Sequence, residues 1–99
     1  MEISKNKNEG ALEIALVGRL DTTTAPQLDE VVKTELDGVK ELSIDCSGLE
    51  YISSAGLRVF LSAQKKMMAT GGAMTVKNVN DIVKEVFEVT GFSDVLTII

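Results

Sequence analysis

The chain opens with alternating apolar and polar residues and continues with three segments whose apolar residues recur every three to four positions. A period of two is typical of strands, and a period near 3.6 is typical of helices. We expect strands over residues 1–7 and 11–20, joined by the turn-forming group Asn8-Glu9-Gly10. Both faces of the second strand carry apolar side chains, which predicts a central strand covered on both sides.

Helical periodicity predicts three helices, which cover residues 24–36, 57–70 and 80–90. The first begins among hydroxyl residues that can cap a helix. Its apolar stripe comprises Ala25, Leu28, Val31, Val32 and Leu36. The second helix is expected to stop at Gly71-Gly72 and the third at Gly91, because glycine readily adopts the conformation that ends a helix.

Short strands are expected between and after these helices, over residues 41–45, 73–77 and 94–98. Residues 46–52, which include Gly48, are predicted to form a loop. The resulting order is β-β-α-β-α-β-α-β. Strands that alternate with helices favour parallel pairing, and the first hairpin adds an antiparallel edge. The predicted fold class is therefore α/β: one domain over residues 1–99, with a mixed β-sheet, an N-terminal hairpin and helices packed on the sheet.

Composition narrows the possible functions. A chain of 99 residues has room for one hydrophobic core, and with 4% aromatic residues and no tryptophan that core must be aliphatic. The net charge is −5 at pH 7, and the densest basic group is the Lys65-Lys66 pair. A chain with this charge repels a phosphate backbone, so nucleic-acid binding is not expected.

The chain has no histidine and one cysteine. It therefore lacks the usual general base near neutral pH and the commonest metal ligand, and no metal site or cofactor is expected. The lone Cys46 cannot form an internal disulfide, which favours a reducing cytoplasm, and we expect it to be a small buried hydrophobic residue. No apolar run approaches the ~20 residues needed to span a bilayer, and no leader pattern is present, so membrane insertion is not expected.

The second helix has an apolar face wider than packing on a sheet requires. One interpretation is that this face packs against both the sheet and a neighbouring helix. The other is that one flank, formed by Val59, Ala63 and Met67, stays partly exposed and receives a partner, since methionine adapts well to interfaces.

The start of the same helix gathers Ser53, Ser54 and Gly56. Backbone amides point outward there with a positive partial charge, which favours anions. A serine that caps the helix is one interpretation, worth about 1 kcal/mol. Because capping needs only one hydroxyl, the second serine is free for another role, and a phosphorylated serine is the sharper hypothesis.

Other motifs give weaker signals. Residues 48–56 contain neither a Gly-x-Gly-x-x-Gly pattern nor a Walker ending, so no nucleotide loop is predicted. Asp21 and Asp45 lie near the ends of strands that could adjoin, where paired carboxylates can perform acid–base chemistry. Without histidine or a metal-ligand cluster, they are expected to hold loops and caps, and no enzymatic activity is expected.

Three sequence blocks, in this order and spacing, resemble the STAS domain of bacterial anti-sigma factor antagonists. They are Gly18-Arg19-Leu20-Asp21 with Thr24-Ala25-Pro26, then Ile44-Asp45-Cys46-Ser47-Gly48-Leu49, then Tyr51-Ile52-Ser53-Ser54-Ala55-Gly56-Leu57-Arg58. The resemblance covers nearly the whole chain, and it implies a mixed β-sheet with helices packed on it.

The resemblance also implies a mechanism. In the family, a serine at the start of the helix after the central strand is phosphorylated by a cognate anti-sigma factor that is also a protein kinase, and a PP2C-type phosphatase removes the phosphate. The unphosphorylated antagonist binds the anti-sigma factor and frees a sigma factor, without DNA contact. Matching the motif's glycine-leucine pair onto Gly56-Leu57 identifies Ser54 as the phosphoacceptor, with Ser53 as the alternative, and puts Asp21 beside it.

The partner-binding surface implied by the resemblance and by the wide helix face comprises Asp21, Thr22, Thr23, Ser53, Ala55, Gly56, Leu57, Arg58, Val59, Ala63 and Met67. Three positions depart from the best-known members. Ser53 stands where those members have aspartate, Ala55 replaces a hydroxyl residue, and Arg58 replaces a common glycine.

Two alternatives remain open from the sequence. STAS domains also serve as docking subunits of membrane transporters or larger sensory assemblies, and in that case the apolar helix flank would bind the permease or the neighbouring subunit. The other alternative is a small enzyme or phosphocarrier that uses Cys46 or Asp21, although no activating group is visible in the sequence.

Overall fold

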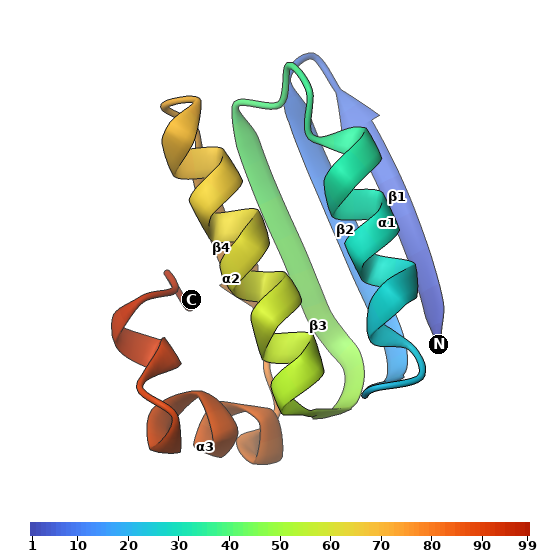
Figure 1. Ribbon diagram of the computed structural model, residues 1–99, viewed down its shortest axis with the longest axis vertical. Coiled ribbons are helices and arrows are strands. Elements are labelled where there is room, and N and C mark those ends of the chain that lie inside the picture. Colours follow the sequence, from blue (N-terminus) through green and yellow to red (C-terminus); the bar gives the residue numbers. More distant parts are fainter.

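Four strands form one sheet, and three α-helices pack around it in the computed structural model, which describes residues 1–99. In chain order the elements are β1 (Glu2–Asn8), β2 (Ala11–Leu20), α1 (Ala25–Glu35), β3 (Glu41–Ile52), α2 (Ser54–Ala69), β4 (Ala73–Lys77), α3 (Asp81–Val89) and the 3-10 helix η1 (Phe92–Asp94). Helices α1 and α2 run side by side across one face of the sheet, and α3 lies across the end where α2 begins (Figure 1). No helix has the length and apolar content needed to cross a bilayer.

The strand order is β1-β2-β3-β4, with β1 antiparallel to β2 and the other pairs parallel. This confirms the predicted α/β class and the N-terminal hairpin. Strand β2 is central, as predicted, but it is covered on one side only. Leu12, Ile14 and Leu16 are buried under the helices, whereas Ala15 is half-buried and Val17 is 45% exposed on the opposite face. The prediction of cover on both sides was wrong because α1 and α2 pack on the same face.

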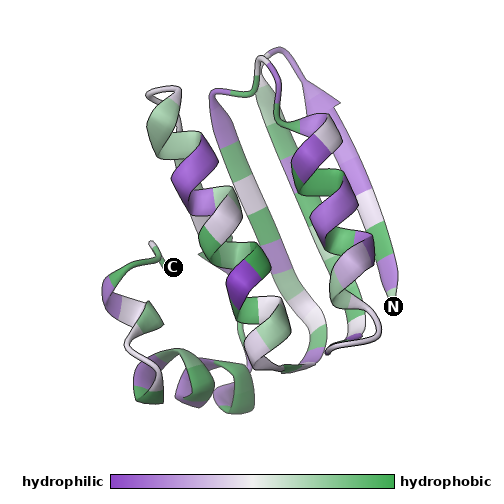
Figure 2. Ribbon diagram, viewed as in Figure 1, coloured by the Kyte–Doolittle hydropathy of each residue, from purple (hydrophilic) through white to green (hydrophobic).

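The core lies between the sheet and the helices, and it is aliphatic as the composition requires. Of its 24 buried side chains only Phe60 and Phe87 are aromatic, and their ring centroids lie 6.0 Å apart, joining α2 to α3. Hydrophobic and polar residues alternate along β3 as far as Cys46, so that every second side chain points into this layer, and beyond it the buried residues are Leu49 and Ile52 (Figure 2). Each fully buried Leu or Ile contributes roughly 1.5–3 kcal/mol relative to exposure, so the helix-covered face supplies most of the stability.

Strand β3 is longer than predicted. The segment expected to form a loop, residues 46–52, continues the strand to Ile52. It does so by pairing with the second half of β2, with shifts in register between Ala15 and Val17 and between Gly18 and Arg19. A side chain on Gly48 would place Cβ 2.9 Å from the Leu16 carbonyl oxygen, so glycine permits the close approach of the two backbones.

The last predicted strand, residues 94–98, is reduced to one bridge. Ile98 pairs with Val76 in parallel, through hydrogen bonds from Val76 N–H to the Thr97 carbonyl (2.8 Å) and from Ile99 N–H to the Val76 carbonyl (2.9 Å). The 3-10 helix takes up residues 92–94, so the chain reaches the edge of β4 only near its end.

Candidate functional site

The start of α2 is attached to the end of two neighbouring strands. Leu20 and Ile52 are register partners at the carboxyl ends of the parallel strands β2 and β3. The Ser53 amide donates a hydrogen bond of 2.9 Å to the Leu20 carbonyl. Parallel strands bring their carboxyl ends to one edge, so the loop that leads into α1 and the start of α2 lie together at this edge (Figure 1).

Gly56, in the first turn of α2, tightens this attachment. A Cβ at Gly56 would lie 2.8 Å from side-chain atoms of both Leu20 and Ile52, which are themselves almost fully buried. Only a residue without a side chain lets the helix approach the strand ends this closely. The backbone of the first turn is therefore held at a fixed position on the sheet edge.

The first turn of α2 offers free amides. Ser53 is the N-cap in an extended conformation, and its carbonyl accepts the first helical hydrogen bond from Leu57 at 2.9 Å. The amides of Ser54, Ala55 and Gly56 come before that bond and have no intrahelical acceptor. The expected serine cap is not formed, because the Ser53 side chain makes no hydrogen bond to these amides. This end of the helix carries a positive partial charge.

The two serines differ in access. Ser54 is exposed, as the first residue of α2. The Ser53 hydroxyl oxygen is buried and has no hydrogen-bond partner. The structure thus presents one of the two predicted hydroxyls to an incoming protein and encloses the other.

The loop before α1 is built around the Asp21 carboxylate. One oxygen accepts hydrogen bonds from the Thr23 amide (3.0 Å) and hydroxyl (2.8 Å) and from the Thr24 amide (3.2 Å). The Thr24 hydroxyl donates to the Arg19 carbonyl at 2.8 Å and accepts from the Asp21 amide at 2.8 Å. These bonds, that of the Thr23 hydroxyl first, hold the pKa of Asp21 below its ordinary value. Thr22 and Thr23 are exposed beside it.

Asp45 and Cys46 lie away from this edge. Asp45 pairs with Ala15, six residues before Asp21 along β2, or about 20 Å at the rise of a strand, so the two carboxylates are not paired. Asp45 accepts hydrogen bonds from the Asn78 side chain and the Ser47 amide, both at 3.0 Å, and the Asn78 bond is the main cause of its lowered pKa. No group of three or more acidic or cysteine residues is placed to hold a metal ion.

Cys46 is completely buried, which confirms it as a core residue. Burial raises the pKa of its thiol to about 12, so the thiol stays protonated at neutral pH. It has neither the access nor the ionisation that a nucleophile needs.

The predicted apolar flank of α2 is not exposed. Val59, Ala63 and Met67 are 7%, 0% and 1% exposed and belong to the core. The expectation that they remain partly open for a partner was wrong, and the alternative, that the wide apolar face packs on more than one element, is confirmed. The physical reason is that α2 is covered by the sheet, by α1 on one side and by Phe87 of α3.

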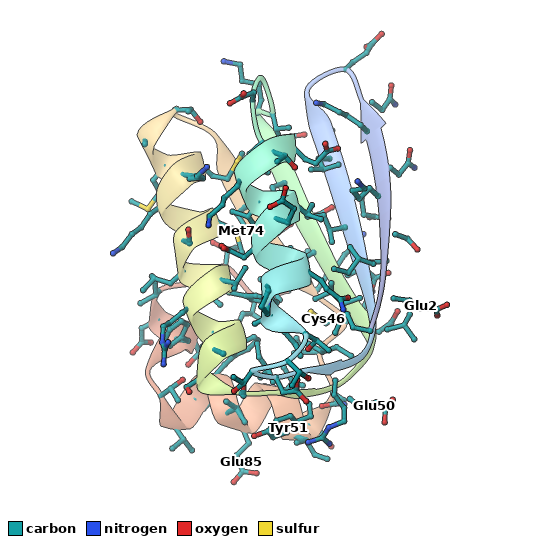
Figure 3. The ribbon with its side chains drawn as sticks, turned by 45° about the vertical axis from the view of Figure 1, so that its right-hand side comes forward. Glu2, Cys46, Glu50, Tyr51, Met74 and Glu85 are labelled. Carbon is teal, nitrogen blue, oxygen red and sulfur yellow. The ribbon has the colours of Figure 1, made fainter.

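One contact at this edge was not predicted from the sequence. The guanidinium carbon of Arg19 lies 4.4 Å from the centre of the Tyr51 ring, a cation–π contact at the end of the sheet. Figure 3 shows Tyr51 near this end, with Glu50 and the Glu85 side chain of α3. Arg19 and Tyr51 are partners in the β2–β3 register. The sequence did not predict this contact, because residues 46–52 were expected to form a loop and not to extend β3 to Ile52.

A mixed four-stranded sheet with α1 and α2 on one face, and with a free helix start beside the ends of its two central strands, defines a small α/β domain of the STAS type. The STAS domain model matches residues 2–99, and the chain belongs to this family.

Relatives extend over almost the whole chain. The anti-sigma-B factor antagonist of Listeria monocytogenes is 32% identical over 97 residues, covering 95% of this chain and 83% of the relative. The anti-sigma-B factor antagonist of Bacillus subtilis is 26% identical over 98 residues, covering 99% of this chain and 90% of the relative. The Bacillus cell fate determinant SpoIIAA in its phosphorylated form has the same fold, with a TM-score of 0.78 at 18% identity, covering 99% of this chain and 91% of that one.

Proposed function

We propose that this chain is a cytoplasmic anti-sigma factor antagonist, a regulatory binding module with no enzymatic activity of its own. In its unmodified form it binds an anti-sigma factor that is also a serine kinase, and the sigma factor is released. Phosphorylation of Ser54 reverses the binding, and a PP2C-type phosphatase restores it. The proposal is supported by full-length relatives that are themselves anti-sigma-B factor antagonists.

The observation that carries the choice of Ser54 is the difference in access between the two serines. A kinase must bring the γ-phosphate into line with the hydroxyl oxygen, which needs open space around that oxygen. Ser54 is exposed at the first position of α2, whereas the Ser53 hydroxyl oxygen is buried. We therefore assign the phosphoacceptor role to Ser54 rather than to Ser53.

Electrostatics indicates where such a switch would act. A phosphate adds about −1.5 to −2 charge, and at the positive end of a helix this charge is tolerated or stabilising. The fold should therefore survive phosphorylation, and the effect should fall on the partner. A partner surface shaped for a neutral hydroxyl would have to bury a dianion, which costs several kcal/mol.

We expect the partner surface to consist of the exposed residues Thr22, Thr23 and Arg58 and the half-buried Ala55 around Ser54, with Asp21 holding the loop in place. Five of the predicted residues are no longer included because they are buried: Gly56, Leu57, Val59, Ala63 and Met67. Their burial also weakens the alternative role as a transporter subunit, since that role relied on this flank for docking.

The test is incubation of the protein with ATP and its cognate anti-sigma factor, the proposed serine kinase, followed by mass spectrometry. We expect one phosphate on Ser54. Ser54→Ala should abolish its incorporation, and Ser53→Ala, the matched control one residue away, should leave it intact. Phosphate on Ser53, or no phosphate on either serine, would overturn the proposal.

A further inference from the structure

We propose that Arg58 is the internal counter-ion of the phosphate on Ser54, so that phosphorylation removes a free cation from the partner surface as well as adding a dianion. The inference rests on the proposed function, because it concerns the phosphorylated form of the same serine. It gives a role to an exposed arginine that the unmodified protein leaves without a partner.

The spacing on α2 brings the two residues together. Ser54 and Arg58 are four residues apart on a helix of 16 residues, and residues at this spacing are neighbours on one helix face, with Cβ atoms about 5–6 Å apart. Both are exposed, while Gly56, half a turn away, faces the strands. An arginine side chain reaches a phosphate on this face, and its planar fork suits phosphate oxygens.

Arg58 has no competing partner. The three ion pairs of the structure join Lys5 to Glu35, Lys33 to Asp29 and Lys77 to Glu13. Arg58 makes no side-chain hydrogen bond, and the one cation–π contact belongs to Arg19. Its neighbours three and four residues away on α2 are Ser54, Ala55, Leu61 and Ser62, none of which is acidic. The guanidinium is therefore free to take up a new anion.

Arg58 is also the only charged residue in the first two turns of α2, residues 54–61. In the unmodified protein this cation is available to a carboxylate of the anti-sigma factor. Once Ser54 is phosphorylated, the same cation is held by the phosphate on its own helix. Phosphorylation therefore replaces one free positive charge on the surface by an ion pair with net negative charge. A carboxylate of the partner loses its attraction to Arg58 and is repelled by the phosphate.

The experiment uses protein with phosphoserine placed at position 54 by genetic encoding, so that no kinase is needed. Titration followed by phosphorus NMR gives the second pKa of the phosphate, which is about 6 in the absence of a cation. We expect this pKa to be lower in the phosphorylated protein, and to rise by about 0.2–0.4 in Arg58→Gln. Phosphorylation should also raise the melting temperature more in the parent than in Arg58→Gln, by about 1–4 °C, because the helix end stabilises the phosphate in both proteins and only the parent adds the ion pair.

Two variants serve as controls. Arg58→Lys keeps the charge and should retain part of the pKa difference. Lys65→Gln removes another cation of α2, which lies roughly 16 Å from Ser54 along the helix axis and beyond the Debye length of about 8 Å, and should change nothing. Each variant's unmodified form reports whether the substitution alone alters folding.

An unchanged phosphate pKa and melting temperature in Arg58→Gln would overturn the inference and leave the proposed function intact. A kinase that never modifies Ser54 would contradict the proposed function, while the encoded phosphoserine would still report on the ion pair.

Discussion

Gly56 rests on Leu20 so closely that one added methyl group would lie 2.8 Å from the Leu20 side chain. The contact joins the first turn of α2 to the end of β2, although the two residues are 36 positions apart in the chain. It means that the position of Ser54 depends on a packing contact beneath it as well as on its own helix.

Gly56→Ala should therefore destabilise the domain. Alanine gains about 1 kcal/mol in helix propensity, but overpacking against Leu20 and Ile52, which are almost fully buried, typically costs about 1–3 kcal/mol. We expect a lower urea midpoint with an unchanged slope. Ser62→Ala, also on α2 but without a hydrogen bond to lose, is the matched control and should stay close to the parent. A Gly56→Ala protein as stable as the parent would mean that the Leu20 and Ile52 side chains can shift to make room for the methyl group at little cost in free energy.

Ser54→Asp should separate stability from binding. A carboxylate at the first position of α2 favours the helix by about 0.3–1 kcal/mol, so the melting temperature should hold or rise slightly. The affinity for the anti-sigma factor, measured by calorimetry, should weaken at least about tenfold, because the anti-sigma factor must bury a charge. Ser54→Ala should bind like the parent. Equal affinity of the Asp and Ala variants would contradict a switch that acts at the interface.

Asp21 should make stability depend on pH in the acid range. Its pKa lies below the ordinary value of 3.8 in the folded protein, chiefly because of the Thr23 hydroxyl. Its stabilising effect is therefore complete above that value, and it is lost as the pH falls through the lower pKa of the folded state. Asp21→Asn keeps the acceptor oxygen and removes the charge, so its deficit in unfolding free energy should be largest near neutral pH and should shrink as the pH falls below 3.8 through the lower pKa of the folded state.

The matched control for this titration is Glu41→Gln. Glu41 is exposed, and its side chain makes no hydrogen bond or ion pair. Urea unfolding across the acid range should show little change in this variant. A deficit in Asp21→Asn that stays constant with pH would indicate lost packing rather than lost charge.

Cys46 should be unreactive toward thiol reagents in the folded protein. The side chain is fully buried and the pKa of its thiol is raised to about 12, so at pH near 8 almost no accessible thiolate exists. A colorimetric disulfide reagent should react only after unfolding in urea. Since the folded pKa is above the ordinary value of 9.0, stability should fall as the pH rises from about 9 towards 12. Rapid reaction without denaturant would contradict this burial.

The sequence pattern predicted the elements well where the periodicity was long. The three helices lie within a few residues of their expected ranges, because each has a broad apolar face and a glycine beyond its end. The prediction failed for residues 46–52, where strand formation depends on pairing with the backbone of β2, which is distant in the sequence. The extension of β3 needs Gly48 to approach Leu16 and Val17 closely, and no local pattern reports that contact.

The site was predictable in kind but not in detail. A helix start with two serines was visible in the sequence, yet which hydroxyl is exposed depends on how Ser53 sits above Leu20. The prediction of an exposed flank on α2 was wrong for a related reason. Residue spacing gives the width of an apolar face, but it does not say how many neighbouring elements cover that face. Phe87 of α3, which packs against Phe60, comes from a distant part of the chain.

The end of the sheet opposite Ser54 is made of tight turns. Gly10, Gly38 and Gly71 all have positive φ values there, and Lys40 connects the turns through hydrogen bonds to Gly10 and Ala73 (Figure 1). A Cβ at Gly38 or Gly71 would meet no other atom within 4 Å, so the chain points into open space at both places. These turns are where an affinity tag, a fluorescent reporter or a whole inserted domain can be spliced in while the regulatory end remains untouched.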